Sequence, residues 1–130
     1  MTSLPPSGRR LAITAEALFL ANLLALPGLA FLAQAWLWRQ HARHPEALAR
    51  NHLRQTFWVS LWGGALLVLV CLGLVLLGGF HWAGTWVAVI LYFTCVHSTL
   101  VLFGIVGLAR AMAGQSYRYP LIGPTLEDDA

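Results

Sequence analysis

Two apolar stretches without a charged side chain constrain the fold of this chain more than any other feature. Residues 57–79 contain no ionisable side chain apart from Cys71, and residues 85–109 contain only Tyr92, Cys95 and His97. Each stretch exceeds the roughly 20 apolar residues that a helix needs to cross about 30 Å of hydrocarbon. Only 10% of the 130 residues are charged, far fewer than in a soluble domain. The sequence therefore predicts an all-α integral membrane protein that forms a single membrane domain over residues 1–130.

A third apolar stretch, residues 14–38, is less regular than the other two. Three polar residues interrupt it, namely Glu16, Asn22 and Gln34. Proline removes a backbone donor and clashes with the preceding helical turn, so we expect a kink or break at Pro27. The sequence therefore predicts three transmembrane helices, over residues 14–38, 57–79 and 85–109. The first of them is either kinked at Pro27 or a re-entrant segment that folds back there.

The positions of the arginines predict which side of the membrane faces the cytoplasm. Residues 39–56 carry four arginines, whereas the turn "HWAG" between the two uncharged stretches carries none. Because arginine-rich loops stay cytoplasmic, we expect the segment 39–56 and the C-terminal tail, residues 113–130, on the cytoplasmic side of a bacterial inner membrane. A full first span would place the N-terminal tail, residues 1–13, on the opposite side, whereas re-entry would place all eight arginines on one side.

The basic segment 39–56 has a helix start signal of its own. Pro45 followed by Glu46 suits the first turn of a helix, where the missing donor is harmless and a carboxylate meets the positive end of the dipole. We expect an amphipathic helix that runs along the interface and bends into the next span near Thr56. Its arginines and histidines would contact anionic lipid headgroups.

The stretch "GQSYRYP" closes the last apolar helix. Gly114 is typical of a residue that ends a helix, and Pro120 prevents the chain from resuming one. Tyr117 and Tyr119 are expected at the level of the lipid headgroups as amphipathic anchors, with Arg118 near a phosphate. The alternative is a docking strip for a partner subunit.

Two motifs carry a resemblance to a known family. They are "GQSYRYPLIG" after the last span and "NHLRQTF" before the middle one, with His52, Arg54 and Gln55. The chain resembles the DUF4870 family of small bacterial membrane proteins, which is distantly similar to the chloroplast import protein Tic20. The chain departs from the family pattern at two places. Thr56 stands where the family usually has a small residue, and Trp58-Val59-Ser60 stands where it often has phenylalanine-glutamine. The resemblance implies a membrane protein without an established activity, or a channel role where it follows the Tic20 branch.

His97 lies near the centre of its span, where an ionisable group is a functional hypothesis by default. Three functional hypotheses stay open for His97, namely haem ligation, metal binding and a proton relay. The structural alternative is a neutral histidine that is hydrogen-bonded to a neighbouring helix, with Asn22 or Gln34 as the expected partner. No second histidine lies at a matching depth, so a haem would have to be shared with a partner. We therefore expect no cofactor.

Other chemistry finds little support in the sequence. His41, His44 and His52 lack the cysteines or carboxylates that would complete a zinc or copper site. No phosphate-binding loop, nucleophile elbow or pair of catalytic carboxylates occurs. We expect no enzyme, no metal site and no nucleic-acid partner.

Small residues in the last span predict close helix packing, which favours association with other membrane proteins or with further copies of the chain. The residues expected at a partner or lipid interface are His52, Arg54, Gln55, Gly104, Gly107, Ala111, Tyr117, Arg118, Tyr119 and Pro120. Three hypotheses follow. The first is an accessory or assembly subunit of the inner membrane, the second is a homo-oligomeric pore or translocation component, and the third is a cofactor-carrying subunit that uses His97. The polar residues expected to line a pore are Glu16, Asn22, Gln34 and His97.

Overall fold

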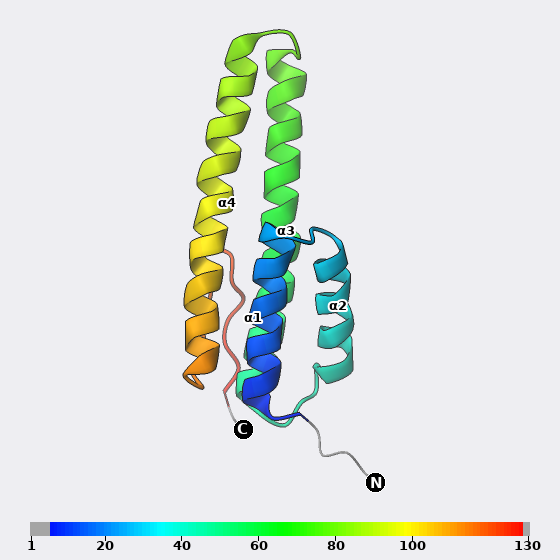
Figure 1. Ribbon diagram of the computed structural model, residues 1–130, viewed down its shortest axis with the longest axis vertical. Helices are drawn as coiled ribbons and strands as arrows, with labels where there is room; N and C mark the ends of the chain where they lie inside the picture. Colours follow the sequence, from blue (N-terminus) through cyan, green and yellow to red (C-terminus); the bar gives the residue numbers. More distant parts are fainter. Residues whose placement is uncertain (1–5, 129–130) are drawn as a thin grey trace.

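The computed structural model describes residues 6–128, and these residues form four helices and no strand. The helices are α1 (Gly8–Leu24), α2 (Leu29–His41), α3 (Ala47–Gly78) and α4 (Ala83–Met112), followed by an irregular tail. Helices α3 and α4 form a long antiparallel hairpin, and α1 and α2 form a shorter hairpin against one half of it (Figure 1). The start of α1, the end of the described tail and the α2–α3 connection lie at the same end of the molecule (Figure 1). The all-helical fold class is confirmed.

Helices α3 and α4 are the two that could cross a membrane. Their apolar windows have mean hydropathies of 2.5 and 2.1, and only 22% and 11% of these windows are buried within the chain. A core helix of a soluble protein would be mostly buried, whereas these helices expose leucine, valine and tryptophan along the half of the hairpin that α1 and α2 leave uncovered. A lipid environment accounts for such a surface. The predicted spans 57–79 and 85–109 fall in these two helices, apart from Gly79 at the end of α3.

Residues 14–38 do not form one kinked transmembrane helix, and the alternative in which the segment folds back at Pro27 agrees with the structure. Helix α1 ends at Leu24, α2 begins at Leu29, and the chain reverses between them (Figure 1). Gly28 has φ 87°, a conformation that suits glycine, and its N–H donates to Asn22 Oδ1 at 2.9 Å. The backbone therefore folds back at the Pro27–Gly28 pair instead of kinking within one helix.

Two predicted boundaries also change. Helix α1 begins at Gly8, inside the predicted N-terminal tail, because the Ser7 hydroxyl caps it by accepting from Arg10 N. Helix α3 begins directly after Glu46, as predicted, but it continues through Thr56 without a break. The segment 39–56 is therefore the end of α2, a short loop and the first turns of α3, not a separate interfacial helix. Residues 1–5 and 129–130 of the two predicted tails lie outside the described residues.

Helix α1 packs closely against α4 because α4 presents glycine to it. A Cβ atom on Gly104 would lie 2.7–2.9 Å from side-chain atoms of Leu20 and Phe19. Phe19 is itself buried in a cluster with Val59, Leu67, Leu100 and Tyr119. Absence of a side chain at position 104 thus fixes how near α1 lies to the long hairpin.

We predict that Gly104→Ala destabilises the protein by about 1–3 kcal/mol, since the added methyl group overpacks a tight contact. Gly73→Ala is the matched control, because nothing lies within 4 Å of a Cβ atom there. The control should be neutral or more stable by up to about 1 kcal/mol, owing to the better helix propensity of alanine. Thermal unfolding in detergent measures both, and equal behaviour of the two variants would contradict the packing described.

Candidate functional site

The most distinctive site is a buried polar cluster centred on Glu16 of α1. Glu16 and His52 are both fully buried, and His52 Nδ1 lies 2.6 Å from Glu16 Oε1. The Tyr119 hydroxyl donates to the other carboxylate oxygen of Glu16. We call these three residues the Glu16 cluster. It connects α1, α3 and the C-terminal tail.

Neighbouring residues make room for the carboxylate and shield it from solvent. A Cβ atom on Gly107 of α4 would lie within 3 Å of the Glu16 carboxylate atoms, so only glycine allows this approach. The ring of Phe19, one turn further along α1, meets the Tyr119 ring edge-on at a centroid distance of 5.1 Å. The cluster is thus enclosed by α4 on one side and by an aromatic contact on another.

The surroundings of His52 determine where its protons lie. Its Nε2 is 2.8 Å from the Gln115 carbonyl oxygen, and a carbonyl can only accept, so Nε2 carries a hydrogen. Its Nδ1 faces Glu16, and one proton is shared between the imidazole and the carboxyl group. The pair is neutral overall with the proton on either partner, which makes its burial tolerable.

Burial and the nearby Glu16 carboxyl group raise the pKa of Tyr119 well above 10. Its hydroxyl therefore keeps its proton and acts as a hydrogen-bond donor. Burial also raises the pKa of Glu16, an effect that the hydrogen bonds from His52 and Tyr119 oppose. The raised pKa of Glu16 favours the protonated, uncharged form of its carboxyl group.

Two further polar side chains of α3 hold the tail in place. Gln55 accepts from the backbone N–H of Tyr119 at 3.1 Å and donates to the Pro124 carbonyl. Asn51 pairs with the backbone of Glu127 in both directions, accepting from its N–H at 2.7 Å and donating to its carbonyl at 2.8 Å. Both amides satisfy backbone groups that an irregular segment would otherwise leave unpaired.

The tail differs from the predicted headgroup anchor. Tyr119 is only 1% exposed and points into the helices, so its assignment to the membrane interface is wrong. Tyr117 is half-buried and packs against the Tyr119 ring at 5.0 Å. Arg118 is exposed and donates to the Gly123 carbonyl at 3.2 Å, and Pro120 is exposed beside it.

Other residues predicted at a partner or lipid interface lie inside the chain. His52 and Gln55 are 0% and 1% exposed, so neither can contact lipid or a partner. Arg54 is half-buried and donates to the Thr125 carbonyl and to Glu127.

The small residues of α4 behave in the same way. The structure places Gly104 and Gly107 against side chains of α1, and it buries Ala111 completely. All three therefore serve packing within the chain.

His97 contacts neither of its two expected partners. Its Nε2 donates to the Leu23 carbonyl at 2.9 Å, near the end of α1, and its ring stacks on Phe93. Asn22 is bonded to the N–H of Gly28, whereas the Gln34 side chain accepts from Ser60 at 3.0 Å. The Nε2 atom of His97 is thus engaged by a backbone carbonyl.

The polar residues considered as pore-lining each make a hydrogen bond within the chain, since Glu16 belongs to the cluster and the other three make the bonds just described; among the described residues, the Nε2 atom of Gln34 is buried without a partner. Over residues 6–128, no group of three or more His, Cys, Asp or Glu side chains could hold a metal ion. His44, for example, faces the Pro6 carbonyl at 3.0 Å and accepts from the N–H of Glu46.

Comparison with known families identifies the chain. Residues 8–126 match the MamF/MmsF family, described as the magnetosome magnetite crystal formation protein family. The chain belongs to this family. Comparisons with curated proteins and with solved structures give no match.

This match corrects the resemblance proposed from the sequence. The family that matches is neither DUF4870 nor a Tic20-like family. The two motifs that suggested the resemblance both lie inside the matched residues 8–126, at His52 and Gln55 and at Tyr119. In this structure they form the contact between α3 and the tail.

We predict that Tyr119→Phe destabilises the fold by about 1–3 kcal/mol, because it leaves a buried acceptor on Glu16 without its donor. Tyr117→Phe is the matched control, since no hydrogen bond of the Tyr117 hydroxyl is seen among residues 6–128, and its effect should stay within about 0.5 kcal/mol. Chemical unfolding in detergent gives both values. A Tyr119→Phe protein as stable as the control would show that this hydroxyl contributes nothing.

The raised pKa of Tyr119 also predicts a pH dependence. Above pH 10 the unfolded chain loses the Tyr119 proton while the folded chain retains it, so stability falls as pH rises, by up to about 1.4 kcal/mol per unit. Tyr119→Phe lacks this contribution, and the stability difference between wild type and variant should shrink from pH 10 upward. A difference that stays constant between pH 8 and 11 would contradict the prediction.

Proposed function

We propose that this chain acts in magnetite crystal formation as a small structural or accessory subunit of the magnetosome membrane. Its membership of the magnetosome magnetite crystal formation protein family supports a role in this process. The single observation that supports a structural role is the Glu16 cluster, in which the buried ionisable groups bond to one another and to the chain's own backbone. The polar chemistry of the chain thus holds its own fold together.

The exposed surface supports a partnership with other membrane components. Among residues 6–128, large exposed apolar side chains extend along the uncovered half of the α3–α4 hairpin, from Leu66 to Leu77 and from Trp82 to Leu91, and others lie on α2 and on the covered half of the hairpin. Lipid tails and the helices of other magnetosome membrane proteins are the partners that such a surface fits. We therefore propose that the chain works by packing in the membrane and carries out no catalysis.

A topology accompanies this proposal. Seven arginines lie in the terminal turns of the helices or in the α2–α3 loop, all at the end of the molecule where α1 begins and α4 ends, and Arg118 lies in the tail. Because basic segments are retained on the cytoplasmic side, this end would face the cytoplasm and the α3–α4 turn would face the magnetosome interior.

The proposed function can be tested by removing the chain from a magnetite-forming bacterium. We expect crystals of altered size or number while the cells still take up iron, as measured by electron microscopy and total iron content. Reintroducing the wild-type chain should restore the crystals. Crystals that are unchanged in size and number would contradict a role in their formation.

A second experiment addresses partnership. Magnetosome membranes are extracted gently into nanodiscs through a tag on the chain, and the proteins recovered in stoichiometric amounts are identified by mass spectrometry. We expect a defined set of membrane proteins. A chain recovered alone, as a monomer, would contradict the accessory-subunit proposal.

A further inference from the structure

The molecule is asymmetric along the direction of its two spanning helices. The tip of the α1–α2 hairpin reaches only the middle of α3 and α4. At this level Leu23 of α1 accepts from His97, the central residue of α4, and the Pro27–Gly28 turn shares a hollow with Ser60 and Gly64, near the centre of α3. Beyond this level, α3 and α4 continue alone (Figure 1).

The tail reaches the same level from the same end. Pro120, Leu121 and Ile122 form a turn that shares an apolar hollow with Leu66 of α3 and Thr99 of α4. Leu121 adopts φ 70°, which is unfavourable for a leucine, and its side chain is fully exposed. A strained backbone that presents a large apolar side chain outward suits an apolar surrounding and not water.

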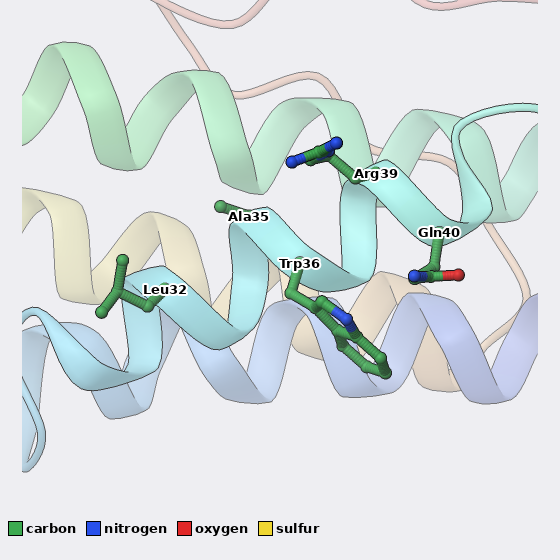
Figure 2. A pocket seen from close by; sticks show the side chains of 5 residues that line it. All are labelled: Leu32, Ala35, Trp36, Arg39 and Gln40. Carbon is green, nitrogen blue, oxygen red and sulfur yellow. The ribbon is translucent and has the colours of Figure 1, made fainter.

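The outer face of α2 has the apolar and polar pattern of a segment that enters a lipid leaflet. Leu29, Leu32 and Trp36 are 67%, 65% and 61% exposed. Arg39 and Gln40 follow at the basic end, and with Leu32, Ala35 and Trp36 they line a shallow hollow of about 510 Å³ (Figure 2). The exposed apolar residues thus lie toward the tip, and the polar ones lie where headgroups are expected.

The length of this pattern fits half a bilayer. Arg39 lies ten positions after Leu29, which at a rise of 1.5 Å per residue is about 15 Å along the helix. One leaflet contributes about half of the roughly 30 Å of hydrocarbon in a bilayer. With Arg39 at the headgroups, the hairpin tip therefore lies near the bilayer midplane, where the tail turn also lies.

We infer that the chain is a wedge in the membrane, which fills one leaflet with four helices and a tail turn and the other leaflet with two helices. We call the half with four helices and the tail the basic half, and the half formed by α3 and α4 alone the far half. With a diameter of about 10 Å per helix, the basic half has about twice the cross-section of the far half. A wedge of this form prefers a membrane that is convex on its basic side. The chain would therefore bind preferentially to, or induce, curved membrane, a physical activity that goes beyond the proposed role in crystal formation.

The closing experiment measures sorting between flat and curved membrane. Purified, fluorescently labelled chain is reconstituted into giant vesicles of phosphatidylcholine with a minority of phosphatidylglycerol, in one orientation, and a thin tube is pulled outward. With the basic end outside, we expect a tube-to-vesicle density ratio above one. With the basic end inside, we expect a ratio below one. A ratio of one in both orientations would overturn the inference.

Variants on α2 identify the wedge itself. The triple substitution Leu29→Ser, Leu32→Ser, Trp36→Ser should weaken the insertion of α2 into the leaflet and lower the ratio toward one, with helix content unchanged in detergent. The matched control, Leu29→Val, Leu32→Val, Trp36→Phe, keeps these positions apolar and should sort like the wild type. If a second copy covers this face instead, the serine variant would turn a dimer into a monomer without any effect on sorting, which would also overturn the inference.

A depth measurement does not depend on these variants. A spin label is placed by Leu121→Cys in a chain whose Cys71 and Cys95 are replaced by alanine. We expect high accessibility to oxygen and low accessibility to a water-soluble nickel complex, as for the bilayer interior. The opposite pattern would place the tail turn in water and would contradict the wedge, whether or not the chain acts in crystal formation.

Discussion

Burying a carboxyl group among apolar helices is the constraint on which the rest of this structure depends. Glu16 cannot be enclosed without partners, since an unpaired buried charge is very costly. His52 and Tyr119 supply them from two distant parts of the sequence. To meet this requirement, α1 must lie against the first turns of α3, α4 must present Gly107, and the tail must turn back into the helices. The cluster therefore fixes the arrangement of the basic half.

The two halves of the molecule consequently follow different physical rules. The basic half is held by specific polar contacts, by the close approach of α1 to Gly104 and by aromatic packing around Phe19. The far half is a plain apolar hairpin whose side chains face outward. The chain belongs to a magnetosome protein family, so the membrane in which these two halves lie is that of the magnetosome. A rigid half that fills one leaflet and a slender half that crosses the other form a shape suited to organising a membrane surface.

The sequence predicted the features that depend on local composition and missed those that depend on pairing over long distances. Uncharged runs located α3 and α4, and the Pro45–Glu46 pattern located the start of α3. The sequence of residues 14–38 did not distinguish two short helices that fold back from one transmembrane helix, because both require a similar content of apolar residues. The fold-back at Pro27 was the interpretation that placed all eight arginines on one side, but local sequence could not decide between the two.

The polar cluster shows the same limit. Tyrosines after an apolar helix usually mark the membrane interface, so nothing local distinguished Tyr119 from an anchor. Its partner Glu16 lies 103 residues away in sequence, beyond the reach of periodicity or spacing. One signal was available: Glu16 is the only carboxylate in any of the three apolar stretches, and a buried carboxylate requires a donor such as His52.

A double-mutant cycle between Glu16 and Tyr119 tests the central claim most directly. The free energies of unfolding of the wild type, Glu16→Ala, Tyr119→Phe and the double variant are compared in the same detergent. The account predicts a coupling energy above about 1 kcal/mol, as for a buried hydrogen bond to a charged group. Strictly additive effects would show that the two side chains act independently and that the cluster does not hold the tail to α1.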